Sequence, residues 1–557
     1  MSRAGPMRRA KVLALACLAL STAHASSVGA QVPRTDSVGS AYRPGIDILD
    51  YDVRLAVPDT GAFIRGDVTV TFRRAPSVAR LRLDLVDGMH VRRVELDGKP
   101  VTTVHRGGEL DVPLAGVARD SAQVRVVYDG GVTDGLIARK DAKGRWTWFG
   151  DNWPDRTRHW LPTVDHPSDK ATVTWRVRAP EGNVVVANGA SLGTNHVTVA
   201  GRAVLETRWR ESRPIPPYLM VIGAGPLVRY DLPESVCHRG EDGECVAQSV
   251  YVLPENRGWL PGPFATAGPI MSLFERLIAP FPYEKLAHIQ SSTRYGGMEN
   301  ASAIFYDGKL FPEQKIREDL LAHEMAHQWF GDAVTEREWA HLWLSEGIST
   351  YFALLFQRDA HGDSAYRGAL SKMREKIFAD TDVAKRPVID TAETDYMQLL
   401  NTNSYDKGAY VLAMLHAELG DSAFFLGMRS YYSDHRHGTA VSDDLRVALE
   451  RSSGRPLAVF FDQWLRRPGF AEPTVGWAYD AASGTVSLLV IQDGRFGTYA
   501  LALPTLVTDA DGVVHRIVAR VPAEPRVRVR VAEQFARRPV SVTVDPDSTL
   551  LARITRL

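Results

Sequence analysis

The chain has 557 residues, which at about 150 residues per domain predicts several domains rather than one hydrophobic core. Hydrophobic residues make up 45% of it, charged residues 24% and aromatic residues 9%, values that exclude long disorder, collagen-like repeats and a disulfide-dense miniprotein. The 66 basic residues balance the 66 acidic ones, so the overall charge favours neither nucleic acid nor an anionic membrane as a partner.

The first thirty residues have the pattern of a secretory signal peptide. Basic residues precede an apolar run over 12–20, and small residues at 23–25 and 28–30 fit a cleavage site. The run is about half of the roughly 20 residues that span a bilayer, and no later stretch approaches that length. We therefore expect a signal peptide over 1–25 or 1–30, no integral membrane span, and export to the periplasm or the medium. An uncleaved N-terminal anchor is the alternative.

Two cysteines remain after this segment, Cys237 and Cys245. In an exported protein they can close a small loop through a disulfide. The alternative is a pair of free thiols on a surface turn.

The N-terminal third alternates apolar and polar residues, as in YDVRLAV (51–57) and DVTVTF (67–72). This period of two is typical of strands with one solvated face. Asp97 and Gly98 separate two such runs and are typical of a tight hairpin turn. The pattern predicts an N-terminal antiparallel β-sheet domain over residues 31–230.

The periodicity changes to three and four in the middle of the chain, which predicts a mainly helical domain over residues 231–470. Alternation returns in TVSLLVI (485–491) and RVRVRV (526–531), so a small C-terminal β domain is expected over 471–557. The fold class is therefore multidomain α+β. Helices of the middle domain are expected at 269–281, 319–331, 348–360 and 408–420.

A metal-binding pattern lies in the second of these helices. His323 and His327 of HEMAH are four residues apart, so on a helix they differ by about 40° and share one face. Both imidazoles can therefore bind one ion. Glu324 lies between them, where its carboxylate can take a proton from a metal-bound water.

A catalytic zinc site uses three protein ligands and leaves a fourth position open. Glu346 in LWLSEG is the candidate third ligand, with 18 residues between it and His327. That spacing allows the first helix to end near Gly331 and a second helix to return and present the carboxylate. The alternative for Glu346 alone is a surface residue at the start of an ordinary helix. Together with HEMAH, it predicts one zinc ion per chain.

These segments resemble the aminopeptidase N family of gluzincin zinc metallopeptidases. The stretch HEMAHQWFGDAVTEREWAHLWLSEG is similar to the family's zinc signature, and GGMEN (296–300) is similar to its exopeptidase motif. SYDKGAYVLAML (404–415) resembles a third motif, in which Tyr405 corresponds to the catalytic tyrosine. The resemblance implies a thermolysin-like catalytic domain. Ser345 departs from the family's asparagine before the zinc ligand, so the hydrogen bonds around the ligands are expected to differ.

The GGMEN segment is the predicted substrate-binding site. Glu299 offers a negative charge to a free α-ammonium group, and Gly296 and Gly297 allow a peptide backbone to approach closely. Met298 is a candidate to line the pocket for the first side chain. The alternative for the glycine pair is an ordinary turn. Asp151 or Asn152 is the candidate for a second contact to the α-amine.

The resemblance implies a zinc-dependent aminopeptidase that acts on peptides with a free N-terminus. Zinc would activate a water molecule, Glu324 would be the general base, and Tyr405 would donate a hydrogen bond to the oxyanion. Alternatives within the same fold are a zinc endopeptidase or a relative with epoxide-hydrolase activity. A catalytically silent peptide-binding scaffold is the alternative from another class, because a fold alone does not imply activity.

Overall fold

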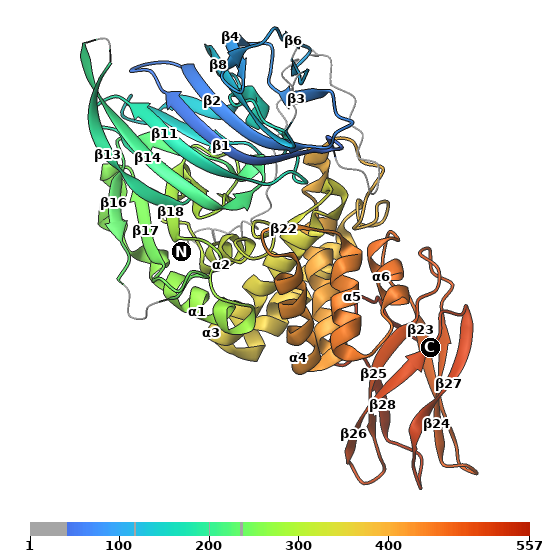
Figure 1. Ribbon diagram of the computed structural model, residues 1–557. Coiled ribbons are helices and arrows are strands. Elements are labelled where there is room, and N and C mark those ends of the chain that lie inside the picture. The colour runs from blue at the N-terminus through green and yellow to red at the C-terminus, as the bar shows by residue number, and fades with distance from the viewer. Residues whose placement is uncertain (1–41, 116–118, 200, 234–237) are drawn as a thin grey trace, which may run out of the picture.

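The computed structural model describes residues 42–115, 119–199, 201–233 and 238–557. The predicted signal peptide and Cys237 lie outside the described residues, and Cys245 is disulfide-bonded. Figure 1 shows three parts in chain order: N-terminal sheets, a helical middle part and a pair of C-terminal sheets at the far end. This arrangement confirms the predicted α+β fold class.

An eight-stranded sheet dominates the N-terminal part, in the order β13-β14-β11-β1-β2-β8-β4-β5. Alternate side chains of β2 are buried, as the period of two predicts. Asp97 (φ 48°) and Gly98 (φ 76°) form the predicted tight turn between β4 and β5. The β1–β11 pair is parallel, which differs from the antiparallel expectation; the long connection between these strands allows it. The strands are β1 (Ile46–Ala56), β2 (Phe63–Arg74), β4 (Met89–Leu96), β5 (Lys99–Pro100), β8 (Ser121–Gly131), β11 (Ala171–Ala179), β13 (Ala190–Val199) and β14 (Arg202–Ile215).

Two smaller sheets complete the N-terminal part. The four-stranded sheet has the order β12-β15-β10-β9, and the three-stranded one has the order β3-β7-β6. Phe149 of β10 contacts Phe305 edge-to-face at 5.7 Å, so the four-stranded sheet packs on the middle part of the chain. The strands are β9 (Gly135–Lys140), β10 (Trp146–Asp151), β12 (Val184–Ala187), β15 (Ile222–Gly225), β3 (Arg80–Asp84), β6 (Val104–Arg106) and β7 (Glu109–Pro113).

A five-stranded sheet lies in the middle part of the chain, in the order β16-β17-β18-β20-β19, and the sequence patterns did not predict it. All seven residues of β18 are buried. Its sequence, KLAHIQS, has four polar residues among the seven, so neither an apolar run nor a regular alternation marks it as a strand, which explains why the sheet was missed. The GGMEN segment contributes the edge strand β19, antiparallel to β20. The strands are β16 (Val228–Asp231), β17 (Ala247–Val252), β18 (Lys285–Ser291), β19 (Gly297–Met298) and β20 (Ala303–Asp307).

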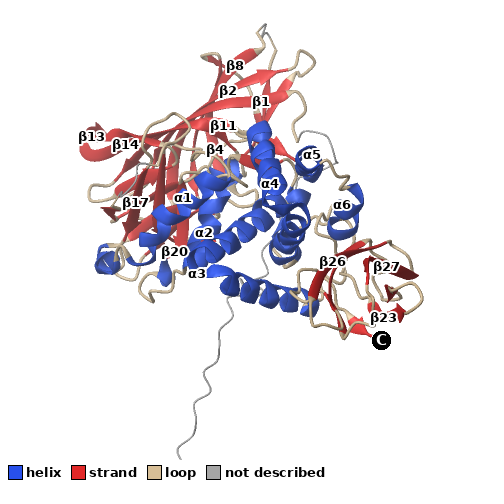
Figure 2. Ribbon diagram, turned by 90° about the horizontal axis from the view of Figure 1, so that it is seen from below, coloured by secondary structure: helices blue, strands red, loops and turns tan. Residues whose placement is uncertain are grey.

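The helices lie between this sheet and the C-terminal sheets (Figure 2). All four predicted helical ranges are helical over most of their length. Gly362 (φ 81°) interrupts α3 and Gly420 (φ 77°) interrupts α4, and the second break coincides with the predicted helix end at residue 420. The α-helices are α1 (Ala267–Leu277), α2 (Glu318–His327), α3 (Trp343–Ala379), α4 (Gly408–His435), α5 (Ser442–Ser453) and α6 (Ala458–Leu465).

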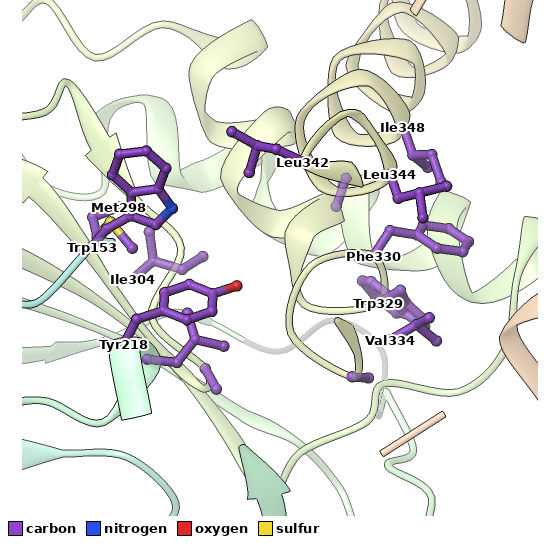
Figure 3. Packing of buried hydrophobic residues seen from close by; sticks show 14 of the residues in the cluster. Trp153, Tyr218, Met298, Ile304, Trp329, Phe330, Val334, Leu342, Leu344 and Ile348 are labelled. Atoms are coloured by element: carbon purple, nitrogen blue, oxygen red, sulfur yellow. The ribbon is translucent and has the colours of Figure 1, made fainter. Parts of the chain in front are cut away.

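The buried cluster that joins these parts contains many aromatic rings. In Figure 3, Trp153, Tyr218 and Met298 lie on one side of the view, and Trp329 and Phe330 lie on the other. Trp153 and Tyr218 come from the N-terminal part, whereas the other three flank or belong to the predicted motifs. The motifs are therefore held in the interior rather than on surface loops.

Among the residues that the structure describes, the stretch Asn403–His435 is long and apolar enough to cross a membrane, judged by length and composition alone. Half of its most apolar window is buried, and its helix α4 packs against α3 and α5. Such packing is that of a core helix, so the stretch gives no clear membrane span.

Two sheets form the C-terminal part, in the orders β27-β24-β23-β29 and β26-β25-β28. They are anchored to the helices: the Tyr410 hydroxyl donates to the Ser548 carbonyl at 2.5 Å, and Gln463 exchanges two hydrogen bonds with the Ala500 backbone. The strands are β23 (Thr474–Asp480), β24 (Thr485–Ile491), β25 (Leu501–Thr508), β26 (Val514–Val521), β27 (Arg526–Gln534), β28 (Ser541–Val544) and β29 (Thr555–Arg556).

Candidate metal centre and active site

Three side chains converge where α2 meets α3. The Nε2 atoms of His323 and His327 are 3.0 Å apart, and they lie 3.2 and 3.3 Å from the Glu346 Oε2 atom. Zinc with bonds of about 2.0–2.1 Å has tetrahedral ligand atoms about 3.3 Å apart. The donor set of two imidazoles and one carboxylate, at these separations, therefore fits one zinc ion.

The local fold explains how His327 and Glu346, with 18 residues between them, meet. Both histidines lie on one face of α2, and Glu346 lies in the first turn of α3, which packs against α2. Between them the chain turns sharply at Gly331 (φ 123°), where a Cβ atom would overlap the Ser345 hydroxyl. A short pair of strands and a 3-10 helix make the return: β21 (Val334–Glu336), which pairs with β22 (Gly438–Ala440), and η6 (Trp339–His341).

Polar groups behind the ligands hold the imidazole rings. The Ser345 Oγ atom lies 3.0 Å from His327 Nδ1, and the Phe330 carbonyl oxygen lies 3.3 Å from the same nitrogen. The Thr350 hydroxyl lies 3.3 Å from His323 Nδ1. Such partners orient a metal-binding ring through its other nitrogen. Ser345, the predicted departure, therefore supplies a contact to His327.

The GGMEN segment (296–300) lies directly against α2, the helix that carries His323 and His327. A Cβ atom at Gly297 would overlap the Glu324 carboxylate, so only glycine permits this approach. Gly296 has no such neighbour. Met298 is buried and pairs with Phe305 of β20. The edge of β19 is thereby placed beside the carboxylate that was predicted to be the general base.

Glu299 lies close to the same group of atoms. Carboxylate and imidazole atoms of Glu299, Glu324 and His327 lie within 4.8 Å of one another. Burial raises the pKa of Glu299 to about 7, with His327 opposing the rise and Glu346 adding to it. Burial also raises the pKa of Glu324 well above its ordinary value, opposed by His327 and increased by Glu299 and Glu346.

The charges of the site favour bound cations. The three carboxylates share a buried space with two imidazoles. Burial, and to a lesser extent the neighbouring carboxylates, raise the pKa values of Glu299 and Glu324, whereas the two histidines lower the pKa of Glu346. A divalent metal ion and one substrate ammonium group together carry three positive charges. The site is therefore balanced when both are bound.

Gln328 connects the two halves of the site, and the sequence reasoning missed it. Its Nε2 atom donates to the Glu299 carbonyl at 2.7 Å and to Asp332 Oδ2 at 2.8 Å. Its Oε1 atom accepts from the Ser302 backbone N–H at 2.7 Å. The side chain is fully buried, so these bonds fix the loop after β19 to the end of α2. Its position directly after HEMAH was the available signal.

Tyr405 lies in a π-helical turn, Asn403–Lys407, just before α4. Its ring stacks on that of His323, with centroids 6.0 Å apart and an angle of 19° between the planes. Single π-helical turns are frequent at functional sites. The structure therefore brings Tyr405 next to the metal ligands, as the motif resemblance implied.

The candidates for a second α-amine contact are engaged elsewhere. The Asn152 Nδ2 atom donates to the Met220 carbonyl at 2.7 Å inside the N-terminal part. Asp151 accepts from the Thr293 hydroxyl at 2.9 Å and pairs with Arg294 at 2.7 Å. Both side chains are fully buried, so neither presents a free group to a substrate.

Comparison with known proteins agrees with this geometry. Residues 49–219 match the Peptidase M1 N-terminal domain, and residues 265–464 match the Peptidase family M1 domain. The chain is 27% identical over 467 residues to "Aminopeptidase N" of Streptomyces lividans, covering 79% of this chain and 52% of that protein. It is 26% identical over 420 residues to "Probable aminopeptidase 1" of Saccharolobus solfataricus, covering 70% of this chain and 50% of that protein. The chain thus spans about half the length of the curated relatives it matches.

Solved structures extend the match. The M1 zinc metallopeptidase from Deinococcus radiodurans superposes with a TM-score of 0.64 at 26% identity, covering 74% of this chain and 91% of that one. A mutant of that enzyme bound to a Tyr-Ser-Ala substrate has a TM-score of 0.66 at 25% identity, covering 76% and 95%. The chain therefore belongs to peptidase family M1 and has the fold of its zinc metallopeptidases.

Proposed function

We propose that this protein is an exported zinc aminopeptidase that removes the N-terminal residue from peptides. The position of Glu299 carries the proposal, because its carboxylate lies within 4.8 Å of ligand atoms of Glu324 and His327. The α-ammonium and the first peptide carbonyl of a substrate belong to the same residue. A substrate whose ammonium binds Glu299 therefore presents its first peptide bond to the metal centre. The names of the relatives support this assignment.

The residues of the site have different roles in peptide-bond hydrolysis. Zinc held by His323, His327 and Glu346 would polarise the scissile carbonyl and lower the pKa of water. Glu324 takes the proton from the attacking water and delivers it to the leaving amine. The Tyr405 hydroxyl donates a hydrogen bond to the oxyanion as the carbonyl becomes tetrahedral.

The edge strand β19 would hold the rest of the substrate. Its position at the sheet edge leaves one side of its backbone without a neighbouring strand in the described sheet. An extended peptide can bind such an edge as an additional strand. Export rests on the pattern of residues 1–30, and detection of the mature protein in the periplasm or medium after cell fractionation tests it.

Purified mature protein should cleave aminoacyl chromogenic amides and spare their N-acetylated forms, because only the free amine can bind Glu299. A chelator should stop the reaction, and added zinc should restore it. Initial rates with each substrate measure this. Internal cleavage of blocked peptides would instead support an endopeptidase. A folded, zinc-loaded protein that cleaves nothing would support a binding scaffold.

Replacement of Gly297 by alanine should lower kcat/KM about 10²-fold, because the new methyl group displaces the Glu324 carboxylate or β19 from its position. Gly296→Ala is the matched variant in the same segment, and it should lose less because its Cβ atom meets open space. Steady-state kinetics with the zinc content of each variant measure the difference. Equal losses at the two positions would contradict the close approach of Glu324 to β19.

A further inference from the structure

The direction of a bound peptide follows from the sheet topology. Strand β19 pairs antiparallel with β20, Gly297 opposite Tyr306 and Met298 opposite Phe305. A peptide whose first residue lies at Glu299 and that extends past Gly297 runs antiparallel to β19. It therefore runs in the direction of β20, at about 3.3 Å per residue, toward the end of that strand at Asp307.

A cavity of about 300 Å³ lies at this end of the sheet. One wall comes from β9 of the N-terminal part, and the others come from the segment before β19 and from the end of β20 with the residues that follow it. The 3-10 helix η5 (Gly308–Leu310) closes this last side. The polar residues that line the cavity are Arg139, Ser292, Thr293, Arg294, Asp307 and Lys309.

Positive charge exceeds negative charge in this lining. The Nε atom of Arg139 donates to the Ser292 hydroxyl at 2.8 Å, and Arg139 forms no ion pair with any carboxylate among the described residues. Lys309 likewise forms no ion pair within the described part of the chain. Asp307 accepts the Lys309 backbone N–H at 3.1 Å. Two cations thus face one carboxylate.

The remaining cation of the lining is already compensated. Arg294 pairs with Asp151 at 2.7 Å and with Asp134, and these bonds hold the segment before β19 against the N-terminal part. Arg139 is different, because its Nε bond to a neutral hydroxyl leaves its charge uncompensated. A guanidinium group suits a planar carboxylate, to which it can donate two parallel hydrogen bonds.

We propose that this cavity binds a carboxylate of the substrate downstream of the scissile bond, with Arg139 and Lys309 as its partners. The carboxylate is either the C-terminus of a short peptide or an acidic side chain of a longer one. The inference rests on the proposed aminopeptidase function and names a substrate class for it: oligopeptides with a negative charge a few residues after the cleaved bond.

A series of peptides of about three to six residues tests the proposal. Each length is made in three forms: with a free C-terminal carboxylate, with a C-terminal amide, and with a C-terminal amide on a last residue that is Glu. At one length the wild-type protein should prefer the free acid over the amide by about 5- to 10-fold in kcat/KM, mainly through KM. If the amidated peptide with a last Glu residue recovers the kcat/KM of the free acid, a side-chain carboxylate is sufficient for binding. If its kcat/KM does not recover, the site accepts only a C-terminal carboxylate.

Arg139→Gln should bring the ratio of free acid to amide close to one, and Lys309→Gln should lower it. Lys140→Gln is the matched control on the same strand, since the Lys140 ammonium lies over the Trp146 ring, 5.7 Å from its centroid. It should keep the wild-type ratio. The ratio should also fall as salt is added, because the cavity is partly exposed to solvent.

A wild-type ratio near one at every length would overturn the proposal, as would a ratio that Arg139→Gln and Lys309→Gln leave unchanged. Failure of the underlying aminopeptidase function is detected separately, because an aminoacyl chromogenic amide carries no downstream carboxylate. Circular dichroism of each variant establishes that the folded proteins are being compared.

Discussion

Replacement of Glu324 by glutamine should lower kcat about 10²- to 10⁴-fold while zinc remains bound. The amide has the shape of the carboxylate, so its packing on Gly297 is retained, but it cannot accept a proton from water at neutral pH. The three groups that converge as metal ligands, His323, His327 and Glu346, are unchanged. The loss should therefore appear in turnover and not in metal content.

Steady-state rates on an aminoacyl amide and the zinc content of each protein measure this effect. Glu318→Gln is the matched control, because Glu318 is a partly exposed residue in the first turn of the same helix and forms a surface ion pair with His361. It should retain wild-type turnover. Substantial activity in Glu324→Gln, or loss of its zinc, would contradict the assignment of Glu324 as general base.

The metal site could be predicted from the sequence because its geometry is local. Two histidines four residues apart share a helix face in any α-helix, so His323 and His327 needed no tertiary information. Glu346 required a second helix to return to the first, which the 18 intervening residues allowed and the motif resemblance supported. The separations of 3.0–3.3 Å among their donor atoms show how closely the two helices bring them together.

The five-stranded sheet that contains the GGMEN segment could not be predicted in the same way. Strand β18 is buried throughout although four of its seven residues are polar, so neither an apolar run nor a regular alternation marks it in the sequence. An edge that could bind an extended peptide was expected at Gly296 and Gly297, but the sheet to which that edge belongs was not. The sequence also could not show that the two glycines differ: Gly297 begins β19 and lies against Glu324, whereas a Cβ atom at Gly296 would meet open space.

Contacts between distant segments explain the remaining differences. Asn152 was a candidate for binding the α-amine, yet its amide donates to Met220, 68 residues later in the chain. Gln328 was passed over, although it joins Glu299 to the end of α2. A polar residue in a motif can serve substrate or structure, and only its tertiary partners distinguish the two roles.

Glu299→Gln should lower kcat/KM for substrates with a free amine about 10²-fold or more, because a buried ammonium group then lacks its charge partner. Substrates with a blocked amine do not use this contact, so their slow cleavage should change little. The ratio of the two rates is therefore the informative quantity. It should fall by about the same factor as kcat/KM for the free amine.

Glu299→Asp is the matched variant, since it keeps the charge and shortens the side chain by one methylene group. It should retain more of the preference for a free amine than Glu299→Gln, whereas a role in packing alone would make the isosteric glutamine the milder change. Equal losses on free and blocked substrates would contradict the ammonium role. Glu299 would then support the fold of the loop that Gln328 binds, and another group would have to recognise the free N-terminal amine.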